Sequence, residues 1–293
     1  MNRIYTVKPE EYPLLLGESI YKPKQLYAMG PLPPPTSVGI AMVGTRRPGN
    51  SAQELCRRLV GALRGTDAVV VSGLAQGIDS LCHEAALEAG IPTVAVLAQG
   101  LGTKIEGSRG ELARRILERG GAIVSEFEPD TPAYKGNFPA RNRIISGLSR
   151  ATVIVQSKAK GGALITAEFA RKEGKPLYAI PGDFDSEVAG GTNDLLDREH
   201  ARPVFRPESL ASILGLPRRG GQSIAAVESS GCRLGGDARA LFAKVNGYRK
   251  TFPELQAESG FNIAKLLAIL TELEIAGLAH TEDNFLFHFN GSA

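Results

Sequence analysis

Residues 38–49 read V-G-I-A-M-V-G-T-R-R-P-G, a short apolar run that ends at a glycine and a polar turn. The same pattern, followed each time by a segment with helical spacing, returns along the chain. It predicts further strands over 68–71, 93–97, 122–124, 152–155 and 177–180, and helices over 51–64, 79–88, 111–118 and 163–172. Short apolar strands that alternate with helices are typical of a parallel sheet covered on both faces. The expected fold class is therefore α/β with a parallel-rich sheet.

Composition divides the chain into four parts. Residues 1–37 are irregular and rich in proline and predict an N-terminal arm or a small packed extension, whereas residues 38–215 carry the α/β pattern. Residues 216–237 contain R-R-G-G-Q-S and predict a flexible linker. Residues 238–293 show a helix, a turn, a second helix and a hairpin-like end, the order of a small winged-helix domain.

The bulk composition excludes several classes of protein. The hydrophobic fraction of 43% and the charged fraction of 22% are ordinary for a soluble globular protein. The three cysteines Cys56, Cys82 and Cys232 have no metal-ligand spacing with the four histidines. No apolar run reaches the ~18–20 residues that cross a bilayer. We expect a cytoplasmic protein without a metal, a cofactor or a membrane contact.

Positive charge is concentrated in one window of the sequence. Residues 135–175 hold nine basic residues and only two acidic ones, Glu168 and Glu173, whereas the whole chain carries +3. A local excess of this kind attracts a polyanion.

The segment F-P-A-R-N-R at 138–143 carries the most informative side chains of this window. Pro139 suits the first turn of a helix, which places Arg141 at the exposed end of an apolar face and points Arg143 outward. Arginine forks bind phosphate oxygens. Lys135 and Phe138 offer a cation and a ring on which a base can stack. A solvated helix end with structural arginine–carboxylate pairs explains the segment equally well.

Two glycine turns provide further candidate anion sites. Gly44-Thr45-Arg46 follows a strand and exposes backbone N–H groups and a guanidinium. Gly161-Gly162 precedes a helix, with Lys158 and Lys160 beside it. An ordinary strand-to-helix turn remains an open alternative for the first of them.

S-G-L-A-Q-G-I-D-S-L-C-H at 72–83 brings an acid and an imidazole close together. Asp79 is placed as the N-cap of a helix, and His83 lies one turn further along the same side. A structural role is favoured over acid–base catalysis, because the sequence shows no nucleophile with a supporting context.

Seven segments in this order resemble the DprA/Smf family (DNA-processing protein A): V-G-T-R, S-G-L-A-Q-G-I-D-S-L-C-H-E-A-A-L, T-V-A-V-L-A-Q-G-L, S-E-F-E-P, F-P-A-R-N-R-I-I-S-G-L-S, G-G-A-L-I-T-A-E-F-A and Y-A-I-P-G. The resemblance implies an extended Rossmann-like domain followed by a winged helix. It also implies a homodimer that binds single-stranded DNA, protects incoming DNA and helps to load the RecA recombinase in natural transformation, without catalysing a reaction.

Carried over position by position, the resemblance assigns DNA contacts to ten residues: Gly44, Thr45, Arg46, Lys135, Phe138, Arg141, Asn142, Arg143, Gly161 and Gly162. The C-terminal segment differs from a reader of duplex DNA. From residue 238 onward it holds five basic and six acidic residues, with Glu272 and Glu274 in the expected recognition helix. We expect this segment to contact protein or to regulate the molecule.

Two rival functions remain at this point. Gly161-Gly162, Thr166 and Glu168 loosely resemble the G-G-x-G-T-x-x-E turn of nucleotide phosphoribohydrolases of the lysine-decarboxylase-like group. The third alternative is a nucleotide-sensing domain with no role on DNA.

Overall fold

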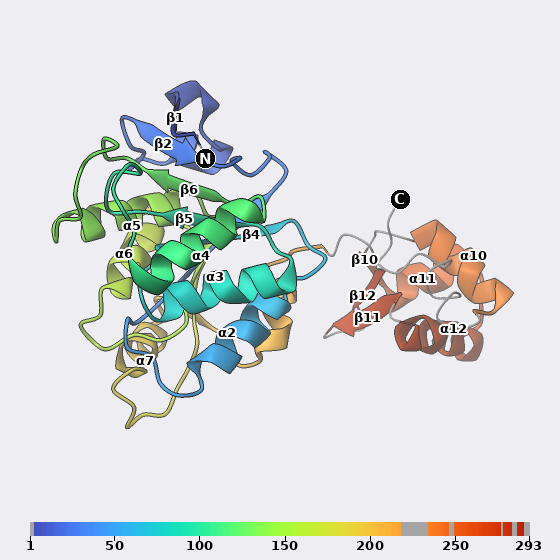
Figure 1. The fold of residues 1–293 in the computed structure, drawn as a ribbon. Coiled ribbons are helices and arrows are strands. Elements are labelled where there is room, and N and C mark those ends of the chain that lie inside the picture. The colour runs from blue at the N-terminus through green and yellow to red at the C-terminus, as the bar shows by residue number, and fades with distance from the viewer. Residues whose placement is uncertain (1–2, 218–233, 246–248, 277, 283–285, 290–293) are drawn as a thin grey trace. The chain divides into compact units, whose positions relative to one another are not determined.

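The apolar run Val38–Val43 forms β3, a central strand of a nine-stranded sheet in the computed structural model (Figure 1). The strands follow the order β1-β2-β6-β5-β4-β3-β7-β8-β9, and those from β6 to β9 pair in parallel. The structure describes residues 3–217, 234–245, 249–276, 278–282 and 286–289. It divides into two units, Met1–Leu216 and Pro217–Ala293, which are described separately.

The remaining elements of the first unit follow the alternation seen in the sequence. The parallel strands are β4 (Ala68–Ser72), β5 (Thr93–Val96), β6 (Ala122–Ser125), β7 (Ala151–Ile154), β8 (Leu177–Ala179) and β9 (Arg202–Pro203). The main helices are α2 (Ala52–Gly61), α3 (Ile78–Ala89), α4 (Gly107–Glu118), α5 (Asn137–Gly147), α6 (Ala163–Lys172), α7 (Gly190–Asp197) and α8 (Leu210–Ile213).

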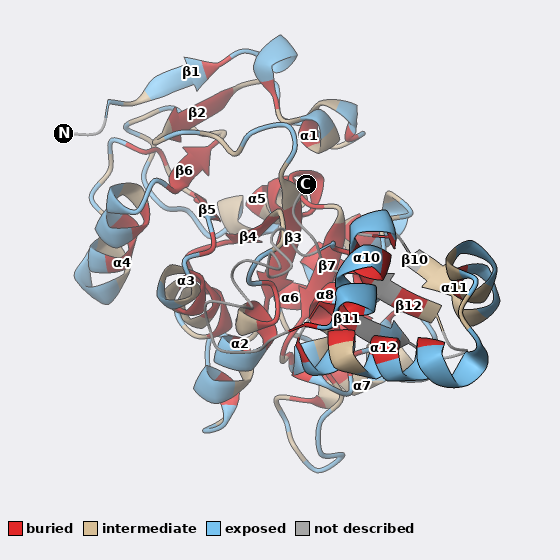
Figure 2. Ribbon diagram, turned by 90° about the vertical axis from the view of Figure 1, so that its right-hand side faces the viewer, coloured by how far each residue is buried: buried red, intermediate tan, exposed pale blue. Residues whose placement is uncertain are grey.

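Both faces of the sheet are buried. Along β3, Ile40 and Met42 pack into the layer formed with α2, α3 and α8, whereas Ala41 and Val43 pack into the layer formed with α5 and α6. Figure 2 shows the buried strands between helices that are exposed on their outer sides. This two-sided burial explains why the strands are continuous apolar runs. The α/β, Rossmann-like fold class predicted from the sequence is confirmed.

The first residues of the chain join the sheet as a small packed extension, one of the two predicted alternatives, but the prediction that they are irregular was wrong. β1 (Tyr5–Val7) and β2 (Leu26–Met29) form an antiparallel pair, separated by a short 3₁₀ helix (Pro9–Glu11) and α1 (Leu14–Glu18). β2 then pairs antiparallel with β6, with Tyr27 opposite Ser125. Strands of three and four residues are too short to give a period-2 signal against the surrounding prolines.

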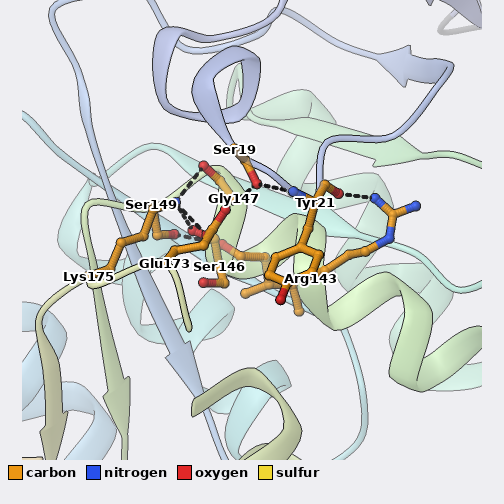
Figure 3. A network of polar contacts seen from close by, with 9 residues as sticks. Ser19, Tyr21, Arg143, Ser146, Gly147, Ser149, Glu173 and Lys175 are labelled. Carbon is orange, nitrogen blue, oxygen red and sulfur yellow. Dashed lines mark hydrogen bonds and ion pairs between the residues drawn. The ribbon is translucent and has the colours of Figure 1, made fainter. Parts of the chain in front are cut away.

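A polar network fastens this N-terminal segment to α5 and α6 (Figure 3). The Ser19 hydroxyl donates to the Glu173 carboxylate and accepts the backbone N–H of Tyr21 at 3.1 Å. The Lys175 ammonium lies 3.1 Å from the same carboxylate. The Arg143 guanidinium donates to the backbone carbonyl of Tyr21. Residues 19–21 are therefore anchored to the core by side chains from both helices.

The second unit consists of small helices and a three-stranded antiparallel sheet. Its elements are α10 (Gly236–Val245), β10 (Arg249–Thr251), α11 (Phe252–Ser259), α12 (Ile263–Ile275), β11 (Ala279–Glu282) and β12 (Leu286–Phe289). The sheet order is β10-β12-β11. The helix at 238–245, the helix at 262–275 and the terminal hairpin follow the predicted order, while the sequence missed α11 and β10. Assignment to the winged-helix class stays a prediction, and most of the predicted linker lies outside the described residues.

Within the described ranges, no helix combines the length and the apolar character that a bilayer span requires.

Candidate nucleic-acid interface

A pocket of about 310 Å³ opens at the carboxyl ends of the central strands, where β3 and β7 lie side by side. The chain leaves these two strands toward opposite halves of the sheet, and such a switch point is where open α/β sheets hold their ligands. The pocket is lined by Val43, Gly44, Thr45, Arg46, Ala75, Asp79, Phe138, Pro139, Arg141, Asn142, Lys158, Lys160, Gly161, Gly162, Ala163, Ile165 and Thr166.

The turn after β3 forms one wall of the pocket and is held in place by backbone hydrogen bonds. The N–H of Thr45 donates to Gln156 O at 2.8 Å, and the Thr45 carbonyl accepts the N–H of Ile78 at 3.1 Å. Gly77 has a φ of +88°, and a Cβ there would lie 2.4 Å from that carbonyl. Only glycine allows this approach, so the 72–79 loop fixes the turn that carries Arg46.

Arg46 and Phe138 meet at the rim of the pocket. Arg46 is exposed, and its Cζ lies 4.7 Å from the centre of the half-buried Phe138 ring. A guanidinium over an aromatic face is a cation–π contact. The two residues belong to different segments, the turn after β3 and the first turn of α5, and together they present a cation and a ring.

The N-terminus of α6 forms the opposite wall. Gly161 and Gly162 precede the helix, and the side chains of Lys158 and Lys160 line the pocket beside them. The first N–H groups of a helix are unpaired and attract anions. Thr166 is 1% exposed, and its hydroxyl has no hydrogen-bond partner among the described residues. This wall therefore offers donors to a ligand.

Arg141 lies under the pocket, and the prediction that it stands at an exposed helix end was wrong. Its side chain is 3% exposed and donates to the carbonyls of Gly73, at 2.6 Å, and Val96. Burial lowers its pKa to about 10, although the Asp79 carboxylate opposes this shift. The residues three and four positions later, Ile144 and Ile145, face the core, so helical geometry turns Arg141 inward with them.

Asp79 organises the loops around the pocket instead of capping α3. The N-cap of α3 is Gly77, and Asp79 lies in the first turn, so the N-cap prediction was wrong. Its carboxylate accepts the N–H groups of Gly73 at 3.2 Å and Gly44 at 3.4 Å. Burial raises the pKa of Asp79, and the positive charge of Arg141 counteracts this rise.

Arg143 and Lys135 do not line the pocket. The Arg143 side chain is 19% exposed, forms an ion pair with Glu126 and donates to Tyr21 O, so the prediction that it points outward was wrong. Arg143 therefore forms the structural arginine–carboxylate pair that the sequence offered as an alternative to phosphate binding. Lys135 is exposed on the loop before α5. Asn142, between the two arginines, lines the pocket, and its amide donates to Gly162 O at 3.3 Å.

Neither His83 nor Glu168 is placed in the pocket where it could act as a general acid or base. His83 is buried with Nδ1 2.7 Å from the Thr93 hydroxyl, and burial lowers its pKa to about 3, so the imidazole is neutral near pH 7. Glu168 forms ion pairs with Arg171 and Lys172 on α6 and does not line the pocket.

The structure thus brings eight of the ten predicted site residues to one pocket. The prediction omitted Asp79 and Thr166 from the site, together with the two lysines. Lys158 and Lys160 were visible beside the glycine turn. The inward position of Asp79 and Thr166 depends on the packing of α3 and α6, which no local pattern reports.

The profile of the family described as DNA recombination-mediator protein A matches residues 3–215. The chain belongs to this family, DprA/Smf. It is 37% identical over 202 residues to the protein Smf of Escherichia coli, a match that covers 69% of this chain and 54% of that protein. The chain therefore spans about half the length of that DprA/Smf protein.

Two solved DprA structures resemble the chain. The protein from Streptococcus pneumoniae superposes with a TM-score of 0.65 and 32% identity, over 72% of this chain and 74% of that one. The protein from Helicobacter pylori, studied for its single-stranded DNA binding mode, gives a TM-score of 0.65 and 30% identity over 73% of this chain and 98% of that one. The family match lies within the first unit, which holds the pocket.

Proposed function

We propose that this chain binds single-stranded DNA in the pocket between β3 and α6 and acts in DNA processing as a recombination mediator. The observation that carries the proposal is the contact of Arg46 with Phe138, opposite the N-terminus of α6. It combines a phosphate-binding cation, an aromatic ring and a helix N-terminus in one concave site. Single-strand binders typically pair a basic groove with rings on which bases stack.

Phosphates are assigned to Arg46, Lys158 and Lys160, assisted by the backbone N–H of Gly162, since the N–H of Gly161 donates to Lys158 O at 2.9 Å. Arg141 contributes a fixed positive charge beneath them and no direct contact of its own. Each phosphate neutralised by a cation makes the slope of log K against log salt more negative by about 0.7 for single strands. Three such contacts predict a slope of about −2, largely independent of base sequence.

Phe138 favours a single strand over a duplex. In a duplex the faces of the bases are covered by stacking, so an aromatic side chain at a pocket rim has no face to contact. A single strand can place one base on the ring, which contributes about 1–3 kcal/mol. Lys135, exposed on the loop before α5, is proposed to contact the strand outside the pocket.

The more specific biological role is proposed by analogy with the DprA/Smf family. We propose that the chain works as a homodimer in the cytoplasm, protects incoming single-stranded DNA and helps to load RecA onto it. The role is binding without catalysis. Support comes from the described pocket, where the ionisable pair Asp79 and Arg141 is buried and engaged in holding backbone groups.

The test compares Arg46→Ala with Arg47→Ala. Arg47 is the next residue of the same turn and is also exposed, but it does not line the pocket. We expect Arg46→Ala and Phe138→Ala each to lower affinity for a single-stranded oligonucleotide at least about 5-fold at moderate salt. Arg47→Ala should stay within about 2-fold, and thermal melts should be unchanged in all three variants.

Wild-type affinity of both Arg46→Ala and Phe138→Ala, measured by fluorescence anisotropy, would contradict the assignment of DNA binding to this pocket. Release of free base from nucleoside monophosphates by the wild-type chain would favour the phosphoribohydrolase instead. Displacement of a bound strand by small nucleotides at low concentration would favour a nucleotide sensor.

A further inference from the structure

The loops at the carboxyl ends of the parallel strands differ in charge from one side of the sheet to the other. The strands lie in the order β6-β5-β4-β3-β7-β8 and end at the same edge, which we call the carboxyl edge. The two outer loops of this series are acidic: Glu126, Glu128 and Asp130 follow β6, and Asp183, Asp185 and Glu187 follow β8.

Basic residues occupy the middle of the carboxyl edge. Lys158 and Lys160 follow β7, Arg46 follows β3, and all three line the pocket. The loop after β4 has no charged residue before the buried Asp79. The segment after β5 then contains Arg109, in the first turn of α4. From β7 to β5 the edge spans three strand spacings, roughly 14 Å.

Arg109 has no counterion among the residues that the structure describes. It is partly buried, whereas Lys104 of the same segment is exposed and pairs with Glu106 at 3.8 Å. The first turn of a helix is also an unfavourable place for a cation, because the helix dipole is positive there. An anion that binds Arg109 therefore relieves a repulsion that the free protein has to bear.

Arg109 lies close to the floor of the pocket. The buried Arg141 guanidinium donates to the carbonyls of Gly73 and Val96, at the ends of β4 and β5. Burial lowers the pKa of Arg141, and the positive charges of Arg46 and Arg109 lower it further. Arg141 thus has one arginine on its β3 side and another in the segment that leaves β5.

We propose that single-stranded DNA in the pocket continues along the carboxyl edge across the ends of β4 and β5, and that Arg109 binds one of its phosphodiester groups there. This inference rests on the proposed DNA binding and adds a phosphate site and a direction to it. The opposite direction leads to the three exposed acidic residues after β8, which repel a phosphate chain. Beyond β5 the loop after β6 is acidic again, so the path ends near Arg109.

Lys135 lies on the same side of the pocket as this path. The Asn137 amide donates to Ala98 O at 3.2 Å, which holds the first turn of α5 against the loop after β5. Lys135 precedes Asn137 by two residues and is exposed. A strand that leaves the pocket toward β5 therefore passes both Lys135 and Arg109, whereas a strand that leaves toward β8 passes neither.

Arg109→Ala tests the path, with Arg119→Ala as the matched control. Arg119 is an exposed arginine at the other end of α4, roughly 15 Å further along the helix axis. For a single strand of about 20 nucleotides, Arg109→Ala should lower the affinity at least about 3-fold at moderate salt. It should also make the slope of log K against log salt less negative by about 0.7, because one phosphate contact is lost. Arg119→Ala should stay within about 2-fold.

The length of the strand separates a contact from a long-range effect of charge. A dinucleotide is too short to extend from the α6 wall of the pocket to β5. In a competition assay, Arg109→Ala should therefore change the affinity for the dinucleotide less than about 2-fold. Arg46→Ala should weaken the binding of the dinucleotide and of the long strand alike.

Removal of Arg109 should not destabilise the fold. Because Arg109 opposes both the dipole of α4 and the charge of Arg141, the melting temperature of Arg109→Ala should equal or exceed that of the wild type. Arg109→Gln keeps a polar side chain of similar length and should lose affinity for the long strand in the same way. A lower melting temperature in both variants would assign Arg109 to the fold and overturn the proposal.

Two further outcomes would overturn the path and leave the proposed function intact. One is wild-type affinity of Arg109→Ala and Arg109→Gln for the long strand while Arg46→Ala weakens it. The other is an equal loss in Arg109→Ala and Arg119→Ala, or an equal loss for the dinucleotide and the long strand, which shows a general effect of charge. If Arg46→Ala also binds like the wild type, the proposed function itself fails together with the path.

Discussion

Lys158 lines the pocket while its ammonium group forms an ion pair with Glu187, in the loop after β8. This contact lowers the pKa of the Glu187 carboxyl, so the carboxylate is ionised near neutral pH. Both side chains are largely exposed, and such pairs contribute little to stability. A phosphate that enters the pocket has to compete with this carboxylate for the same cation.

Glu187→Gln should therefore strengthen the proposed binding of single-stranded DNA. We expect a gain of about 1.5- to 5-fold at low salt, because Lys158 is released from an exposed and therefore weak ion pair, and a smaller gain at high salt, where this ion pair is screened. The measurement is an anisotropy titration at two salt concentrations.

Glu208→Gln is the control for that titration. Glu208 forms a similarly exposed ion pair with Arg58 but does not line the pocket. An equal gain in both variants would show a general charge effect, and no gain in Glu187→Gln would show that the carboxylate does not compete.

At the scale of single residues, the sequence located the pocket better than it oriented the side chains. Gly44, Arg46 and Gly161 were predictable because glycine turns after parallel strands meet at one edge of a sheet. The directions of Arg141 and Arg143 were not, because they depend on the way α5 packs. Arg141 faces the core with Ile144, and Arg143 faces a segment that the sequence left irregular.

Among the elements, α5 serves two surfaces. Phe138 and Asn142 line the pocket with the buried Arg141 beneath them, whereas Arg143 holds the N-terminal segment through the Tyr21 carbonyl and pairs with Glu126, next to β6. Arg143 therefore stabilises the fold, although it lies in the same motif as the pocket residues.

Arg143→Ala should destabilise the fold and spare DNA binding. Glu126 is 15% exposed in its side chain and would lose its counterion, at a cost of about 2–4 kcal/mol in the free energy of unfolding. Urea denaturation measures this loss, and affinity for a single-stranded oligonucleotide should change less than about 2-fold.

Arg171→Ala provides the comparison for this loss. Arg171 pairs with Glu168 on the exposed side of α6, so its removal should lower the free energy of unfolding far less than the removal of Arg143 does. If Arg143→Ala weakens DNA binding strongly and leaves the urea midpoint unchanged, the anchoring role is wrong.

Elements differ in how well the sequence predicts them. The central strands and α6 were found because buried apolar runs and helical spacing are strong local signals. β1, β2 and β9 have only two to four residues each, and β2 joins the sheet through β6, which lies far along the chain. Such strands form because a neighbouring edge offers hydrogen bonds, which a local pattern does not contain.

For the whole molecule, the proposed DNA-binding pocket lies within one of the two units. Each residue that lines the pocket belongs to the unit Met1–Leu216. A chain that ends at Leu216 should therefore keep the affinity for single-stranded DNA within about 2-fold and keep the salt slope. A salt titration of both chains measures this, and a loss of 10-fold or more would show that the second unit takes part in binding.

The pairing of β2 with β6 has a consequence for how the chain is made. Tyr27 lies opposite Ser125, and β3 in the middle of the sheet pairs with β7 at residues 151–154. On the ribosome, β1 and β2 can pair with each other early, but about a hundred further residues have to emerge before β6, the strand that joins them to the sheet, exists. Until then their apolar side chains are open to chaperones and proteases. The segment that closes the edge of the finished sheet is synthesised long before β6, the strand that holds it there.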